Sequence, residues 1–285
     1  IGGGGILVTH PDLEYVYDGP VSPVNAVFEN LILTDNTAAA GAGISIWRVS
    51  GPTLSNLIIQ ENTSEHYGGG LMIFSANASV TDITVTGNNC YRNDSVGGGM
   101  IINNSEATLT NVTVNDNTAS YGGGIFILDT DAALINLTVS GNTATFFGGG
   151  LFVGANTNPI LTNSIIWGND PTQIQGLGTP TITYSDIQGG WNGIGNIDTD
   201  PLFTDANNGD YTLQEGSPCI DAGTADLNGD GIDDITDYND LAPDMGAYEF
   251  ETIIPAPTGF QYVLQSSSVM LWWDPSTDEN FQYFL

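Results

Sequence analysis

Short apolar runs that alternate with polar residues return along most of the chain at a nearly constant interval. Six of them read NLILTDN, NLIIQEN, DITVTGN, NVTVNDN, NLTVSGN and SIIWGND, starting at Asn30, Asn56, Asp82, Asn111, Asn136 and Ser164. Alignment of the runs places Leu31, Leu57, Ile83, Val112, Leu137 and Ile165 in one apolar column and Leu33, Ile59, Val85, Val114, Val139 and Trp167 in another. An apolar residue at every second position is typical of a strand with one buried face. Each run therefore predicts a strand.

A glycine triplet follows each of the first five runs. The triplets end at Gly43 (as Gly-Ala-Gly), Gly70, Gly99, Gly124 and Gly150, at intervals of 25 to 29 residues, and a second short apolar run follows each. An interval of about 26 residues that holds two strands leaves no room for a crossover helix. The interval predicts a solenoid in which each repeat is one coil and each strand pairs in parallel with its equivalent in the next coil.

Asparagine recurs at the corner after the first strand of each repeat. The positions are Asn36, Asn62, Asn88, Asn117 and Asn142. Stacked asparagines hydrogen-bond to their neighbours and to their own backbone, and glycine supplies the positive φ or the close approach that other corners need. The fixed place of these asparagines in the repeat favours a structural ladder over glycosylation acceptors.

The glycine triplets, the asparagine corners and the period together resemble the right-handed parallel β-helix, or pectin-lyase-like, superfamily of large secreted bacterial proteins. The resemblance covers residues 1–190 and implies an all-β parallel β-helix solenoid. The phrases NSIIWGND, YSDIQGGWNGIGNIDTDPLF, GDYTLQEGSPCIDAG and DMGAYEF resemble the terminal coils of bacterial β-helix surface proteins that carry a C-terminal sorting or anchoring region. That second resemblance implies that residues 191–250 form a terminal coil and a cap over the open end of the solenoid.

Two segments depart from the repeat. Residues 9–23 add about 12 residues to the first interval and predict an insertion loop, whose His10, Tyr15 and Tyr17 are candidate ligand-binding residues because aromatic rings stack on sugars. Residues 251–285, with a Pro-rich lead, Thr-Gly-Phe and VMLWWDPS, are similar to the start of a fibronectin type III module, which needs about 90 residues. We expect a linker and a truncated module there, in a fragment of a longer protein with further coils upstream.

Charge narrows the possible partners. The chain has 33 acidic residues and only two basic ones, Arg48 and Arg92, for a formal net charge of −31. Nucleic acid is excluded because phosphate binding depends on Lys and Arg, and polyanionic sugars are disfavoured unless a divalent cation bridges them. No apolar run is long enough to span a bilayer, and the first residues lack a secretory signal. We expect a glycan or a protein as partner, at the cell surface or outside the cell, with signal and anchor beyond this chain.

The segment DLNGDGIDDITD, residues 226–237, resembles a calcium-binding loop of the dockerin or thrombospondin type. Its candidate ligands are Asp226, Asn228, Asp230, the Ile232 carbonyl, Asp234 and Asp237. Hard oxygen ligands at alternating positions, with a glycine for the sharp turn, are what Ca²⁺ requires. The loop departs from the EF-hand pattern in having Asp at the eighth and twelfth positions. We expect a structural calcium ion that stiffens the cap.

Three functions are compatible with this pattern. A non-catalytic adhesive or structural module is favoured, because β-elimination needs a cation beside the substrate carboxylate and the Gly-His-Gly and Asn-Thr-Asp signatures of polygalacturonases are absent. A carbohydrate-active enzyme of the same fold is the alternative, with its site on coils missing from this chain or on the loop of residues 9–23. His66 and Tyr67 are the only adjacent pair that suggests a lyase base and acid. Ice binding by an outward threonine column (Thr84, Thr113, Thr138) ranks third.

Cys90 and Cys219 are compatible with one disulfide or with two buried thiols.

Overall fold

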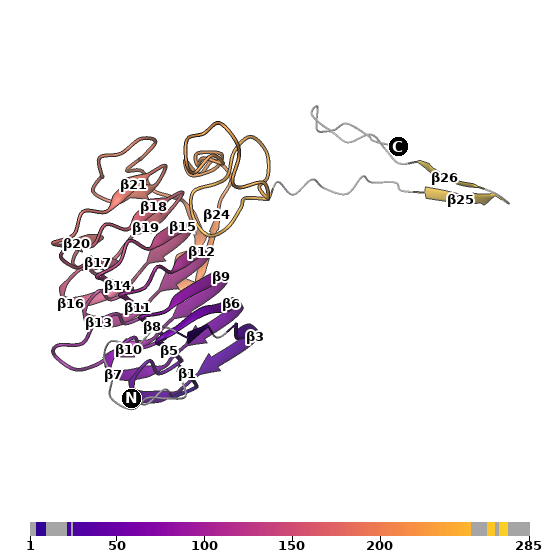
Figure 1. Cartoon of the computed structure of the whole chain (residues 1–285). Coiled ribbons are helices and arrows are strands. Elements are labelled where there is room, and N and C mark those ends of the chain that lie inside the picture. The colour runs from indigo at the N-terminus through magenta and orange to yellow at the C-terminus, as the bar shows by residue number, and fades with distance from the viewer. Residues whose placement is uncertain (1–3, 10–21, 24, 252–260, 266–267, 273–285) are drawn as a thin grey trace. The chain divides into compact units, whose positions relative to one another are not determined.

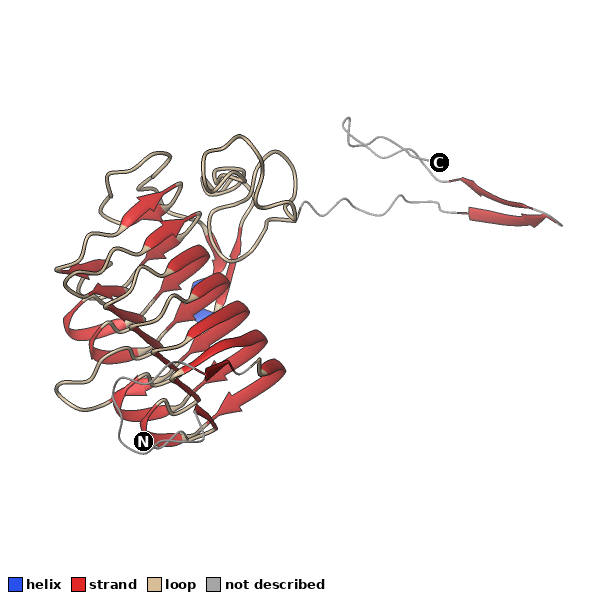
Figure 2. Ribbon diagram, viewed as in Figure 1, coloured by secondary structure: helices blue, strands red, loops and turns tan. Residues whose placement is uncertain are grey.

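The structure is a computed structural model that describes residues 4–9, 22–23, 25–251, 261–265 and 268–272. The chain divides into two units, residues 1–250 and 251–285. The first unit is a parallel β-solenoid (Figure 1), and its only helical turn among the described residues is the 3-10 helix η1 (Ala206–Asn208) (Figure 2). The predicted all-β parallel β-helix with about 26 residues per coil is confirmed.

Three parallel sheets line the coils of the first unit. Sheet A contains β1 (Ile6–Thr9), β5 (Ile44–Trp47), β8 (Leu71–Phe74), β11 (Met100–Asn103), β14 (Ile125–Leu128), β17 (Leu151–Val153) and β20 (Ile174–Gly176). Sheet B contains β2 (Ser22–Pro23), β3 (Val27–Thr34), β6 (Val49–Gln60), β9 (Asn77–Thr86), β12 (Thr108–Asn115), β15 (Ala133–Ser140), β18 (Ile160–Thr162), β19 (Ile165–Trp167), β21 (Thr181–Thr183) and β22 (Asp186–Ile187). Sheet C contains β4 (Thr37–Ala40), β7 (Thr63–Tyr67), β10 (Asn89–Cys90), β13 (Thr118–Tyr121) and β16 (Thr143–Phe147).

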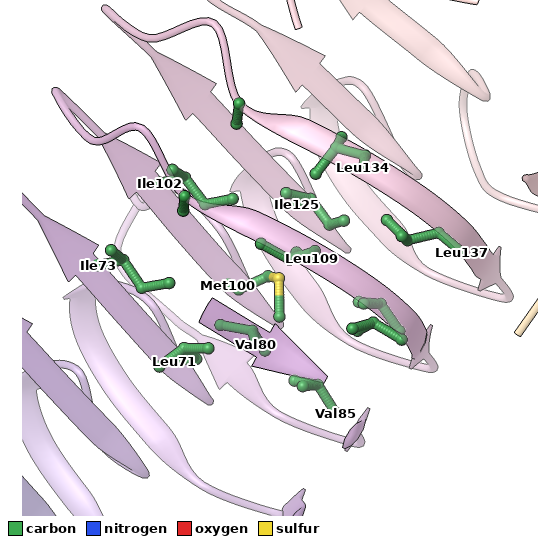
Figure 3. Close-up of a cluster of buried hydrophobic side chains, with 14 of the residues drawn as sticks. Leu71, Ile73, Val80, Val85, Met100, Ile102, Leu109, Ile125, Leu134 and Leu137 are labelled. Atoms are coloured by element: carbon green, nitrogen blue, oxygen red, sulfur yellow. The ribbon is translucent and has the colours of Figure 1, made fainter. Parts of the chain in front are cut away.

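The interior is one continuous stack of aliphatic side chains. Leu57 pairs with Ile83, Ile83 with Val112, and Val112 with Leu137, so the predicted apolar column is confirmed for these coils. Figure 3 shows side chains of sheet A, such as Leu71 and Met100, lying in the same interior as those of sheet B. Because each coil covers the apolar face of the next, the core has no break from Leu33 to Ile187.

The predicted register of the sixth run is wrong by one residue. Ile165 pairs with Thr138 and Ile166 with Val139, so Ile166 joins the core while Ile165 faces outward. The corner residue is Asn163, at φ +52° like Asn136 at +54°, and not Ser164. Two consecutive isoleucines satisfy the alternation in either register, and a slip by one residue exchanges the two faces of a strand.

The coils turn at residues in the left-handed conformation. In one coil these are Asn56 (φ +52°), Glu61 (+54°) and Gly68 (+54°), and equivalent corners recur in the neighbouring coils. Asparagine, aspartate and glycine enter this region most readily. Their repetition in the sequence therefore reflects the corners of the solenoid.

The terminal region, residues 188–250, packs along the outer face of sheet B as well as on the last coil. It contains the antiparallel hairpin β23 (Phe203–Asp205) and β24 (Asp210–Leu213), which lies beside sheet B (Figure 1). The Ala247 amide donates to Thr138 Oγ1 at 2.9 Å, and Thr113 Oγ1 donates to Tyr248 Oη at 3.1 Å. This region thereby covers the side of the solenoid.

The threonine column predicted for ice binding is not an outward array. Thr113 is 2% exposed and Thr138 is 1% exposed, because the terminal region covers them, and Ile165 continues the same column. With two of its three threonines buried and Thr84 half-buried, the column offers no array to an ice lattice. The ice-binding alternative is therefore wrong.

The second unit contains one described hairpin. Strands β25 (Gln261–Gln265) and β26 (Ser268–Trp272) pair antiparallel. Two paired strands are compatible with the start of a β-sandwich, but they do not identify one. The fibronectin-like module stays a prediction.

Candidate functional site

The outer faces of sheets A and C carry a second apolar cluster. Along β14, Ile125 and Ile127 face the core, whereas Phe126 faces outward. The same alternation places large side chains outward on successive coils. We call the following eight residues the aromatic surface: Trp47, Tyr67, Phe74, Tyr121, Phe126, Phe146, Phe147 and Phe152.

Strand register stacks several of these rings on one another. The rings of Phe126 and Phe152, which are paired residues of β14 and β17, have centroids 5.0 Å apart and planes 1° apart. Tyr121 contacts Phe146 with centroids 5.3 Å apart and meets Phe152 edge-on at 5.9 Å. Neighbouring strands are about 4.8 Å apart, so equivalent aromatic residues in adjacent coils stack without further adjustment.

Parts of the aromatic surface are open to solvent. Tyr67 is 48% exposed, Phe146 45% and Phe147 51%. A contiguous cluster of exposed aromatic side chains on a strongly charged protein indicates a binding surface. The aromatic surface is therefore our first candidate site.

An Arg–Glu ion pair and a contact between a histidine and a carboxylate lie beside Tyr67. The longer link between β10 and the next glycine corner carries Arg92 and Asp94, and it brings Arg92 Nη2 to 3.0 Å from Glu65 Oε2. The same link places Asp94 Oδ1 3.5 Å from His66 Nδ1. These exposed pairs add little to stability, but they supply hydrogen-bonding groups at the edge of the aromatic surface. The His66 ring centroid lies 5.8 Å from that of Tyr67.

The five ladder asparagines form one row. Asn62 Oδ1 accepts the backbone amide and the Nδ2 group of Asn36 at 3.0 and 2.9 Å, and each later asparagine repeats this arrangement. The row runs through Asn36, Asn62, Asn88, Asn117 and Asn142 and continues to Asn169, which the sequence reasoning missed. Asn169 lies in the run SIIWGND, two residues after Trp167. Aligning this run with the others by its corner asparagine would have identified it. Its Nδ2 donates to Gln173 Oε1, which ends the row.

The calcium-type loop is held by its own backbone. The Asp226 carboxylate accepts hydrogen bonds from the amides of Gly229, Asp230 and Gly231, and these bonds, that of Gly231 first, lower the pKa of Asp226. Asp234 Oδ2 accepts the Leu227 amide. Within the loop, Asn228 Nδ2 donates to Asp234 Oδ1, the Asp230 amide donates to Asn228 Oδ1, and the Ile232 amide donates to Asp230 Oδ1. Asp237 is exposed. Among the described residues, no three His, Cys, Asp or Glu side chains are arranged to hold a metal ion.

Several predicted features have a simple outcome. His10, Tyr15 and Tyr17 lie outside the described residues. Cys90 and Cys219 are both free and buried, and burial raises the pKa of the Cys90 thiol to about 12. Of the two possibilities for these cysteines, the structure therefore has the buried thiols.

A buried carboxyl group joins the last coil to the terminal region. Asp186, at 0% exposure, accepts hydrogen bonds from the Thr199 amide at 3.2 Å and the Cys219 thiol at 3.4 Å. Burial raises the pKa of Asp186 to about 6, and the nearby charges of Asp198 and Asp200 act in the same direction. Compared with the unfolded chain, the folded state therefore favours the protonated form of the Asp186 carboxyl group.

We expect stability to fall as the pH rises through about 6, because a raised pKa favours the folded state only while the group is protonated. The Asp186 contribution is complete below the ordinary pKa of 3.8 and is lost above about 6. The difference corresponds to roughly 3 kcal/mol. Asp186→Asn should raise the melting temperature at about pH 8 and flatten its pH dependence. Asp233→Asn, which removes an exposed charge, is the control, and equal melting curves for both variants would contradict this explanation.

A three-sheet parallel solenoid with an asparagine ladder and an aromatic outer surface defines the molecule as a β-helix protein. The profile of the family described as right-handed β-helix region matches residues 15–166, just over half of the chain. The chain belongs to this family. No curated protein and no solved structure matches it. No helix among the described residues has the length and hydrophobicity to cross a membrane.

Proposed function

We propose that this chain is a non-catalytic, extracellular or cell-surface β-helix module that binds a neutral glycan on its aromatic surface. The observation that carries the proposal is the set of exposed rings, including Tyr67, Phe146 and Phe147, that a rigid solenoid holds on its outer face. Sugar rings present flat C–H faces that pack on aromatic rings, and a site of this kind needs few polar groups to fix orientation. Glu65, Arg92 and Asp94 supply such groups at its edge.

The charge of the chain favours a neutral glycan. A formal net charge of −31 repels uronates and sulfated sugars at distances up to the Debye length. Neutral polysaccharides escape this repulsion. A protein partner would use the same aromatic surface. Retardation by a neutral polysaccharide in the binding experiment supports a glycan ligand, and its absence argues against one.

The test is affinity electrophoresis in gels that contain neutral or uronate polysaccharides. The native chain should be retarded by a neutral polysaccharide, and the double variant Phe146→Ala, Phe147→Ala should bind at least about tenfold more weakly, because each exposed ring contributes on the order of 1 kcal/mol. Trp191→Ala, at an exposed tryptophan of the terminal region, is the matched control. Equal retardation of the two variants, or none for the native chain, would contradict the proposal.

A carbohydrate-active enzyme is the second candidate, and the His66–Asp94 pair beside Tyr67 favours it. An imidazole beside a phenol supplies two groups that base and acid catalysis uses. We nevertheless expect that incubation with neutral and uronate polysaccharides in the presence of calcium yields no new reducing ends or unsaturated products. Release of either product, and its loss in His66→Ala, would replace the adhesive proposal with the enzymatic one.

Calcium binding at residues 226–237 stays a prediction, since no described cluster is arranged for a metal. If calcium stiffens this loop, chelation should lower the melting temperature, and Asp226→Asn should remove the difference between the calcium-loaded and chelated protein. An unchanged melting curve on chelation would rule the structural ion out.

A further inference from the structure

A cleft lies between the outer face of sheet B and the hairpin β23–β24. Its volume is about 620 Å³, within the range of small-ligand sites. One wall comes from the solenoid, with Asp116 at a corner and Trp167 at the end of β19, and the other comes from residues 200–214, with Asp205 and Phe203. Segments about 90 residues apart in sequence thus form one site. The cleft is separate from the aromatic surface, which lies on sheets A and C.

The cleft is preformed. Tyr211, 3% exposed, anchors the hairpin, and its ring meets that of Phe203 edge-on with centroids 5.2 Å apart. The solenoid wall stays open because two of its corners are glycines, Gly141 and Gly168, at φ +67° and +70°. The equivalent corner of an earlier coil is Glu61, whose side chain would fill this space. A Cβ atom on Gly141 would lie 2.6 Å from Asp116 Oδ1, so the carboxylate occupies the space that a side chain would take.

The lining is negative. Asp116, Asp200 and Asp205 are all exposed within it, and neither arginine of the chain is part of it. Burial and the charge of Asp116 raise the pKa of Tyr211 to about 12. A ligand with a carboxylate or phosphate would be repelled, whereas an ammonium group would be attracted.

The lining also offers apolar and hydrogen-bonding groups. Trp167 and Phe203 are half-buried, and the neutral polar side chains of Thr204, Asn207 and Gln214 lie around them. We propose that this cleft binds an amino sugar: the carboxylates hold its ammonium group, Trp167 and Phe203 contact its ring, and the neutral polar groups hydrogen-bond its hydroxyls. A lysine side chain would use the carboxylates but not the hydroxyl partners, so the sugar fits the lining better.

The test is calorimetric titration of the whole chain with a fully deacetylated glucosamine tetramer. The native chain should bind it, more weakly at high salt, and Asp116→Asn with Asp205→Asn should weaken binding at least about tenfold, since two charge-assisted contacts are lost. Both positions are exposed, so the fold should persist, which the melting temperature checks. Asp233→Asn, an exposed acid of another loop, is the matched control. The Phe146→Ala, Phe147→Ala variant should bind the tetramer normally, which separates this site from the proposed glycan surface.

Four outcomes would overturn the proposal. They are no binding of the tetramer, equal affinity for the N-acetylated tetramer, equal affinity for a lysine tetrapeptide, and no effect of the double aspartate variant. The second would show that the ammonium group is not recognised, and the third that only the charge is. Failure of neutral-glycan binding at the aromatic surface would leave the result at the cleft unaffected.

Discussion

Replacement of Asn117 with alanine is expected to lower the free energy of unfolding by about 4 kcal/mol, because several buried polar groups lose their partners at once. Asn117 Oδ1 accepts both the backbone amide and the Nδ2 group of Asn88, at 2.9 and 3.0 Å. Its own Nδ2 donates to the Val85 carbonyl and to Asn142 Oδ1. Asn117 is 0% exposed, so water does not replace these bonds without local opening of the coil.

Urea denaturation followed by circular dichroism measures this effect. Asn93→Ala, an exposed asparagine in the link after β10, should change the unfolding free energy by less than about 0.5 kcal/mol. Asn117→Asp retains the acceptor oxygen but brings a carboxylate next to the Val85 carbonyl, and it should remain strongly destabilised at neutral pH. If Asn117→Ala were as stable as Asn93→Ala, the row would be a consequence of coil stacking and not one of its causes.

Features that repeat in every coil could be predicted from the sequence. The column Leu57, Ile83 and Val112, and the asparagine row, follow from side chains that recur at one interval because each coil has the same cross-section. In a solenoid, the interval between residues in the sequence therefore also tells which of them are in contact. The predicted register was wrong at Ile165 and Ile166. Both of these consecutive residues are apolar, so the alternation does not show which of them faces the core.

Features that form once could not be predicted in this way. The cleft brings Asp116 together with Asp205, and no periodicity relates the two positions. The burial of Thr113 and Thr138 likewise depends on where residues 246–248 return to sheet B. The aromatic surface is an intermediate case, because its residues follow the repeat but belong to outward positions that the core column does not constrain.

Replacement of Gly123 with alanine is expected to destabilise the chain by about 3 kcal/mol or to prevent soluble folding, because the added methyl group has no space. An ideal Cβ at Gly123 would lie 2.3 Å from the Thr143 carbonyl oxygen and 2.8 Å from that of Gly149, both backbone atoms of the next coil. Backbone cannot rotate away as a side chain does, so the coils would have to separate. Gly123 lies between Tyr121 and Phe126, and the same shift should therefore weaken glycan binding at the aromatic surface.

The control for Gly123→Ala is Gly189→Ala. Gly189 has a φ of +90°, but a Cβ there would meet no atom within 4 Å. The control should thus report only the backbone strain of a non-glycine residue, roughly 1 kcal/mol. Urea denaturation measures both variants, and polysaccharide retardation is compared for those that fold. Gly123 itself has no positive φ, so a loss no larger than that of Gly189→Ala would mean that the coils make room for the added methyl group. A larger loss for Gly123→Ala, accompanied by weaker glycan retardation, would mean that close packing of consecutive coils also positions the outward rings.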